Sequence, residues 1–287
     1  MTNIYLGNGN DVLTLSAPDI CWGAQIFGQN GADRITLDVV RLSDIFVSGG
    51  NGRDEIVLTS SSGNALSGDN GNDILRAFGT YNLLCGGSGA DILEVGPGSS
   101  TGSPATASFA NTLDGGRGDD LLISNSFVAD FGRPAYPAGL GNTLTGGAGR
   151  DTFQLTGRGD LHVTNEAGDG VVSEGDEVRG LMDVITDYRR GEVLDIAAGT
   201  RADEVAVTAE TPHFPTGFGE RHQHLVLADG AYAAFRGTYA GPGSFTVDAG
   251  GGDLLVVWDV LDGVDDPVLG GSVALLGVTR LSDVLIA

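Results

Sequence analysis

Seven aspartates recur between residues 11 and 151, and each follows a glycine two positions earlier. Glycine permits positive backbone φ angles and lets carbonyls approach one another, while the aspartate adds an anionic oxygen. Such a turn presents hard oxygen ligands, which Ca²⁺ accepts at about 2.3 to 2.6 Å. The aspartates are Asp11, Asp33, Asp54, Asp73, Asp91, Asp120 and Asp151, and the glycines are Gly9, Gly31, Gly52, Gly71, Gly89, Gly118 and Gly149.

Further glycines stand four and five positions before most of these aspartates and add carbonyls to the predicted calcium ligands. Three copies have Leu6, Gln29 and Asp69 at these positions, so the sites are expected to differ in affinity, and Asp69 is a candidate additional ligand. Plain hairpin turns are the alternative, because Asn-Gly is a common turn signal. Seven copies in phase favour ligands. The further glycines are Gly7, Gly28, Gly49, Gly50, Gly68, Gly86, Gly87, Gly115, Gly116, Gly146 and Gly147.

Apolar residues repeat in phase with the aspartates. The residues seven before and two after each aspartate are apolar in every copy, as Ile26 and Ile35 are around Asp33. Alternating apolar residues after the aspartate predict a half-buried strand. Successive aspartates are 22, 21, 19, 18, 29 and 31 residues apart, which fits one coil of two short strands and two turns. The sequence therefore predicts an all-β fold, a parallel β-roll or β-solenoid of about seven coils.

The motif GGxGxDxUx, as in "GGSGADILE" at 86–94, resembles the nonapeptide repeat of RTX proteins, and the resemblance extends from residue 4 to about residue 196. It implies a calcium-binding β-roll. Two Ca–O bonds on opposite sides of an ion span about 4.8 Å, which matches the strand spacing. Seven turns in one row then predict up to about six Ca²⁺ ions between neighbouring coils.

The sequence departs from the usual RTX pattern in having one motif per coil instead of one about every nine residues. One edge of the roll is therefore expected to bind calcium and the other not. The second edge carries an asparagine nine positions before four of the aspartates, which predicts a stacked ladder. Solvated turn asparagines are the alternative. These residues are Asn64, Asn82, Asn111 and Asn142.

After Asp151 the repeat stops, which divides the chain into a roll at 1–160 and a C-terminal β-rich capping region at 161–287. The segment 183–196 resembles the one that closes RTX arrays, and the resemblance makes Asp183 and Asp187 candidates to complete the last calcium site. A surface carboxylate is the alternative for Asp183. Later segments read as antiparallel strands, one with an Asp-Gly hairpin turn.

Composition limits the partners. The 287 residues carry a net charge of −23, which argues against nucleic acid and against an anionic membrane. A bilayer-spanning run of about 18 apolar residues is absent from the sequence. Cys21 and Cys85 belong to coils roughly three apart, beyond the reach of about 7 Å that a disulfide needs, and are interpreted as free thiols.

Catalytic motifs are missing. The chain contains neither HExxH nor GxSxG, and it has no lysine. We therefore expect that the protein is not an enzyme. The segment "HFPTGFGERHQH" brings His213, His222 and His224 within 12 residues, and an exposed loop is favoured over a His-x-His metal site.

The chain ends resemble those of exported RTX proteins. The first residues contain no cleavable secretory signal. The final "DVLIA" resembles the uncleaved signal of type I secretion. We therefore expect a bacterial protein that the type I secretion machinery exports, located outside the cell or at its surface.

Two function classes follow from these patterns. The first is a structural protein that folds on binding calcium and associates head-to-tail through the open solenoid end into a filament, matrix or surface layer. The second is a calcium-dependent adhesin or carbohydrate-binding module for extracellular polysaccharide. Its surface is expected on two long loops at 95–111 and 124–142, which carry Phe109, Phe127, Phe131 and Tyr136.

Overall fold

The structure is a computed structural model that describes most of the chain as two compact units. The first unit holds residues 1–129, 142–154 and 192–194, and the second holds residues 130–141, 155–191 and 195–287. The described residues are 3–16, 23–38, 43–97, 107–126, 140–157, 161–164, 168–196, 198–202, 205–207, 211–212, 221–259 and 271–287.

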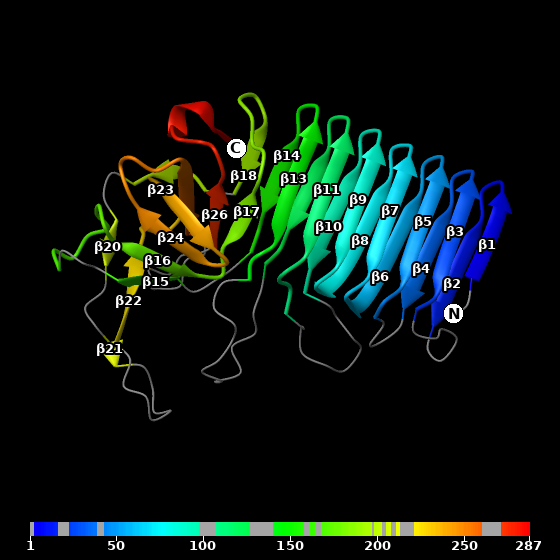
Figure 1. The fold of residues 1–287 in the computed structure, drawn as a ribbon, viewed down its shortest axis with the longest axis horizontal. Coiled ribbons are helices and arrows are strands. Elements are labelled where there is room, and N and C mark those ends of the chain that lie inside the picture. The colour runs from blue at the N-terminus through cyan, green and yellow to red at the C-terminus, as the bar shows by residue number, and fades with distance from the viewer. Residues whose placement is uncertain are drawn as a thin grey trace. The chain divides into compact units, whose positions relative to one another are not determined.

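The first unit is a parallel β-solenoid of seven coils, as the sequence predicts (Figure 1). Each coil gives one strand to each of two sheets. One sheet contains β1 (Asn3–Asn8), β3 (Gln25–Asn30), β5 (Phe46–Asn51), β7 (Ala65–Asn70), β9 (Leu83–Ser88), β11 (Thr112–Arg117) and β13 (Thr143–Ala148). The other contains β2 (Val12–Ser16), β4 (Arg34–Asp38), β6 (Glu55–Ser62), β8 (Ile74–Thr80), β10 (Ile92–Gly96), β12 (Leu121–Ser124), β14 (Thr152–Leu155) and β18 (Val193–Asp195).

Equivalent residues of successive copies lie side by side. Ile26 pairs with Val47 in the first sheet, and Ile35 pairs with Ile56 in the second. The inward side chains are 0 to 1% exposed from the second coil onward, because each coil covers the apolar face of the next. The apolar period of two therefore identified the core positions correctly.

The first coil is less well covered than the others. Its inward residues Ile4 and Leu13 are only half-buried. Tyr5 and Val12, on the outer faces of β1 and β2, are 59% and 75% exposed. Within residues 3–16 these two strands pair only with β3 and β4, so each has one edge without a neighbouring strand.

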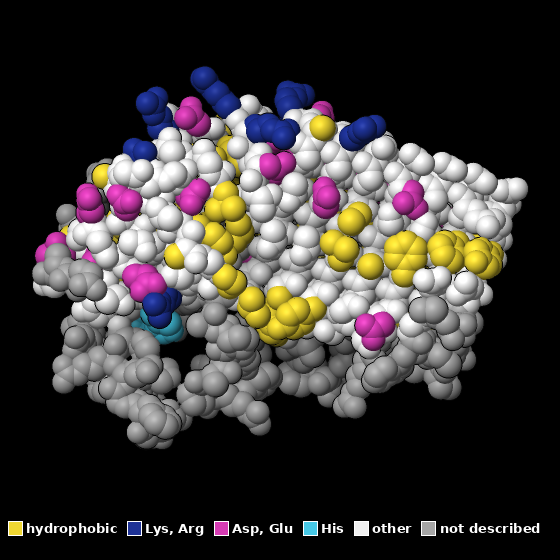
Figure 2. Space-filling view, viewed as in Figure 1, with side chains coloured by type: hydrophobic (Ala, Val, Ile, Leu, Met, Phe, Trp, Pro, Cys, Tyr) yellow, Lys and Arg dark blue, Asp and Glu magenta, His cyan; other side chains and the backbone are white. Residues whose placement is uncertain are grey.

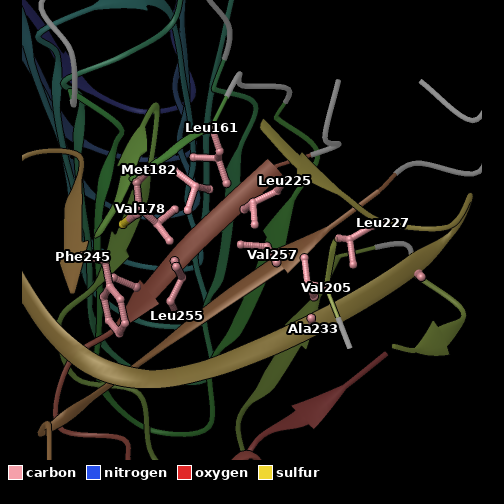
Figure 3. Close-up of a cluster of buried hydrophobic side chains, with 13 residues drawn as sticks. Leu161, Val178, Met182, Val205, Leu225, Leu227, Ala233, Phe245, Leu255 and Val257 are labelled. Atoms are coloured by element: carbon pink, nitrogen blue, oxygen red, sulfur yellow. The ribbon is translucent and has the colours of Figure 1, made fainter. Parts of the chain in front are cut away.

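The second unit is a mostly antiparallel β-structure, as expected for the C-terminal region. Its hydrophobic core includes Leu161, Val178, Leu225, Phe245 and Leu255 (Figure 3). The elements are β15 (Leu161–Thr164), β16 (Glu177–Gly180), β17 (Asp183–Ile185), β19 (Thr200–Arg201), β20 (Ala206–Val207), β21 (Thr211–Pro212), β22 (Arg221–Val226), β23 (Ala231–Gly241), β24 (Ser244–Val247), β25 (Asp253–Trp258), β26 (Gly271–Leu275), the 3-10 helix η1 (Leu281–Asp283) and β27 (Leu285–Ile286).

Helices contribute little to the described ranges, and none of the helices there is long and apolar enough to cross a bilayer. Cys85 is a free thiol. Cys21 lies outside the described residues.

Candidate metal-binding edge of the roll

The seven aspartates form a ladder along one edge of the roll. The backbone N–H of each of the first six aspartates donates a hydrogen bond to the side-chain Oδ1 of the aspartate in the next coil. From the second coil to the seventh, one carboxylate oxygen per coil therefore holds neighbouring turns together. The N–H groups of Asp11, Asp33, Asp54, Asp73, Asp91 and Asp120 donate in this way to Asp33, Asp54, Asp73, Asp91, Asp120 and Asp151, at 2.7 to 3.0 Å.

The second carboxylate oxygen, Oδ2, differs from Oδ1 in its hydrogen bonding. It is buried and accepts no hydrogen bond in six of the aspartates. A buried anionic oxygen without a partner is costly, and proteins ordinarily satisfy it with a proton or a cation. The six residues are Asp11, Asp33, Asp54, Asp73, Asp91 and Asp120.

Burial has the corresponding electrostatic effect. Desolvation, together with the charges of neighbouring aspartates, raises the pKa of Asp73 and of Asp120 to about 7, although a backbone N–H bond acts in the opposite direction. Burial also raises the pKa of Asp33, Asp54 and Asp91 above the ordinary value of 3.8. Desolvation, backbone N–H groups and neighbouring aspartates are the causes of these pKa shifts, and a positively charged side chain, which would lower the pKa, is not among them.

Backbone carbonyls converge on the same carboxylate oxygens. A Cβ placed on Gly28 would stand under 3.0 Å from both Oδ2 of Asp33 and the carbonyl oxygen of Gly49 in the next coil. The two oxygens therefore flank a common point that only glycine leaves open. The same arrangement recurs at Gly68, Gly86 and Gly115, beside Asp73, Asp91 and Asp120.

Close approach between coils also requires glycine at the position two before the aspartate. Gly52 has a φ of +137°, and a Cβ there would clash with the carbonyl oxygen of Gly31. The same contact with a carbonyl of the preceding coil recurs at every copy from Gly31 to Gly149, whereas at Gly9 only the positive φ of 124° favours glycine.

The oxygen-rich edge suits a hard cation better than a transition metal. Within the described ranges no three His, Cys, Asp or Glu side chains are grouped to hold an ion. Each turn offers one carboxylate, and the other converging groups are backbone carbonyls. Carbonyl and carboxylate oxygens are the donor set of Ca²⁺, so the residues present fit the ion that the repeat motif implies.

The opposite edge confirms the predicted asparagine ladder. The N–H of Asn64 donates to Oδ1 of Asn82 at 3.2 Å, and the N–H of Asn82 donates to Oδ1 of Asn111 at 2.9 Å. The amide nitrogens repeat the pattern, since Nδ2 of Asn111 donates to Oδ1 of Asn142 at 3.0 Å. At the end of the ladder, Nδ2 of Asn142 donates to the hydroxyls of Ser124 and Ser126. All four asparagines are at most 2% exposed, so they are not solvated turn residues.

Two of the three departures from the glycine pattern carry backbone strain. Gln29 and Asp69 have φ angles of 79° and 71°, in the left-handed region that glycine favours. The carboxylate of Asp69 accepts hydrogen bonds from the hydroxyls of Ser48 and Ser67, at 2.5 and 2.7 Å. Both Asp69 oxygens are therefore engaged with serines, in contrast to the buried Oδ2 atoms of the ladder.

Glu192 occupies an eighth position of the aspartate ladder that the sequence analysis missed. The N–H of Thr152, directly after Asp151, donates to the carbonyl of Asp120, and the N–H of Val193, directly after Glu192, donates to the carbonyl of Asp151. Glu192 is 2% exposed, and Leu194, two positions later, is fully buried. The apolar residues two and four after Glu192 were the sequence signal, but glutamate and the missing glycines concealed it.

The other predicted residues are distributed as follows. Asp183 is 3% exposed and lies in β17 of the second unit, so it is not a surface carboxylate. Asp187 forms an ion pair with Arg189 at 3.8 Å. Phe109 packs edge-on against Tyr81, with ring centroids 5.7 Å apart. Phe127, Phe131, Tyr136 and His213 lie outside the described residues.

The fold and its edge define a parallel β-solenoid with a row of carboxylates between its coils. No protein-family model matches the sequence, and no curated protein matches it. The class of the protein therefore rests on the coil register and on the chemistry of its turns.

Proposed function

We propose that the first unit is a calcium-binding β-roll whose folding is coupled to calcium. One observation carries the proposal: six buried aspartate Oδ2 atoms in a row accept no hydrogen bond, and glycine carbonyls converge beside them. Bound calcium ions would supply the positive charge that these oxygens lack. Because an ion between coils needs oxygens from both, calcium would bind the folded roll and not the unfolded chain.

The chain's own residues would hold up to about six ions in one row, one between each pair of neighbouring coils. The ligands are the seven aspartates together with the turn glycines, in the manner of the RTX repeats that the sequence resembles. Because the sequence resembles exported RTX proteins, we also propose that the protein is exported. A calcium-free chain with a charge of −23 is poorly folded inside the cell and folds outside it, where calcium is abundant.

Removal of calcium tests this function directly. Purified protein at pH 8 is placed in a chelator or in millimolar calcium, and its circular dichroism and melting temperature are recorded. We expect loss of β signal or a much lower melting temperature in chelator, full recovery with calcium, and little recovery with magnesium, which demands stricter octahedral geometry. An identical spectrum and melting temperature in both solutions would contradict the proposal.

Self-association is a second candidate function, and the first coil favours it. β1 and β2 offer unpaired edges within residues 3–16, next to exposed Tyr5 and Val12. In the second sheet β14 pairs with β18 on its far side, whereas β2 pairs with β4 alone among the described strands. Contact between two first coils is two-fold and closes as a dimer instead of extending as a filament.

Sedimentation and electron microscopy of the protein with calcium distinguish monomers, dimers and filaments. We expect dimers, and monomers for Val12→Asp, because a charge on the exposed edge opposes strand pairing. Monomers of the unmodified protein would exclude association through this edge, and long filaments would restore the head-to-tail arrangement that the sequence suggested.

A further inference from the structure

Two histidines from distant parts of the sequence lie opposite each other in the second unit. His162 on β15 and His224 on β22 are directly paired across an antiparallel ladder. Their ring centroids are 5.0 Å apart, and the ring planes are inclined by 56°. Figure 2 shows histidine side chains at the surface of the molecule, beside acidic and basic groups.

The core of the second unit fixes the direction of both rings. Leu161 and Val163, on either side of His162, are 1% and 6% exposed, and Leu225, beside His224, is fully buried (Figure 3). Because side chains alternate between the faces of a strand, both imidazoles stand on the outer face. Each is half-buried and is held by a strand that is anchored in the core.

The ring separation matches that of two imidazoles sharing one metal ion. An ion about 2.1 Å from one nitrogen of each ring lies roughly 3.2 Å from each centroid. At tetrahedral or octahedral angles the two centroids are then roughly 4.5 to 5.2 Å apart, which includes the observed 5.0 Å. The inclined planes also resemble adjacent ligands of one ion more than a parallel ring stack.

The charged groups around the two histidines are compatible with a bound cation. Arg179 on β16 lies opposite His162 on its other side, but its guanidinium is ion-paired with Glu177 at 2.8 Å. Glu177 also accepts a hydrogen bond from the hydroxyl of Ser244. The positive charge of Arg179 is therefore locally balanced, in a chain that is strongly acidic.

We propose that His162 and His224 form a bidentate site for a divalent transition-metal ion of the zinc or nickel type, with solvent completing the coordination. Imidazole nitrogen suits such ions, whereas calcium takes oxygen ligands. The site is thus chemically separate from the aspartate edge. Two protein ligands leave open positions, which suits an exchangeable ion or one shared with a ligand from outside the chain.

The test is a zinc titration of the full-length, calcium-loaded protein by calorimetry, repeated with nickel. We expect one ion per chain, and about 100-fold weaker binding for either His162→Ala or His224→Ala, because loss of one ligand removes the chelate. His222→Ala, which changes another histidine of β22, is the matched control and should leave affinity unchanged. Circular dichroism confirms that each variant keeps its β signal.

Three results would overturn the site. The first is zinc binding of unchanged strength in the double variant of His162 and His224. The second is loss of binding in His222→Ala, which would indicate the His-x-His site instead. The third is an absence of zinc and nickel binding at millimolar concentration. The calcium stoichiometry of the roll is measured alongside, so failure of this proposal is distinguishable from failure of the calcium proposal.

Discussion

In the four coils that carry asparagines, the two edges of the roll use nearly the same ladder and differ by one side-chain atom per coil. At one edge asparagine Oδ1 accepts the backbone N–H of the preceding coil, and at the other aspartate Oδ1 does so. The edges differ in the second terminal atom of the side chain, which is Nδ2 in asparagine and Oδ2 in aspartate. Asparagine Nδ2 donates to the next amide, as from Asn82 to Asn111, whereas aspartate Oδ2 has nothing to accept.

If calcium binds as we propose, this difference makes the stability of the roll depend on an ion. The asparagine edge satisfies its own polar atoms within the protein and closes in any solution. The aspartate edge keeps the same backbone geometry but leaves a buried anionic oxygen in each coil. The free energy of closing that edge therefore depends on what neutralises the oxygen, which is a proton or, under our proposal, calcium.

Acidity should affect the calcium-free roll most strongly. The folded roll raises the pKa of five aspartates, two of them to about 7, so it binds protons more tightly than the unfolded chain. This contribution to stability is present below the ordinary value of 3.8 and is lost as the pH rises through about 7. Melting temperatures in chelator should therefore fall steadily from pH 5 to pH 8.

The double variant Asp73→Asn, Asp120→Asn controls for the general charge of the chain. It removes the two most strongly shifted carboxyls, so its melting temperature in chelator should depend less on pH. A calcium-free protein that is as stable at pH 8 as at pH 5 would show that the aspartate edge does not carry unbalanced charge.

Placing a carboxylate in the neutral ladder should have the next largest effect. Asn111→Asp would bury a charge where Nδ2 now donates to the carbonyl of Gly79 and to Asn142. We expect a loss of about 3 kcal/mol or more in the free energy of unfolding at pH 8, with or without calcium. Asn111→Ser is the uncharged control. If Asn111→Asp gained calcium-dependent stability instead, the two edges would be interchangeable.

Replacing an aspartate of the other edge by asparagine should have a smaller effect on stability. In chelator this change should stabilise the protein. Asp91→Asn keeps Oδ1 for the N–H of Asp73 and turns an amide donor toward the carbonyl of Gly115. We expect the calcium-free protein to gain about 1 kcal/mol and the loaded protein to bind about one ion fewer. Chemical unfolding and calcium counting by mass spectrometry measure both. An unchanged ion count would remove Asp91 from the ligands.

The eighth ladder position should give the smallest effect. Glu192 follows the roll's register but comes from a segment without the turn glycines. Glu192→Gln should weaken only the last calcium ion of the row, by about tenfold, and leave the others unchanged. Glu174→Gln, at an exposed glutamate, is the control. Equal calorimetric titrations for the two variants would restrict the row to the seven aspartates.

The sequence determined the fold of the roll and the composition of both edges. Every copy has an apolar residue seven positions before its aspartate and another two positions after it, as Leu84 and Leu93 are around Asp91. Stacking equivalent residues of successive copies is the arrangement that buries all these apolar side chains. A repeat with local contacts and fixed register leaves few alternatives, so coil number, core positions and the asparagine ladder followed from spacing alone.

Only the tertiary structure decided what each polar atom meets. Spacing could not show that Oδ1 of each aspartate is taken by the next N–H while Oδ2 stays buried, since these are contacts between residues 18 to 31 positions apart. It also could not align Glu192 with the ladder or place His162 opposite His224. These contacts arise where irregular strands pair across the sequence, and no repeat records that pairing.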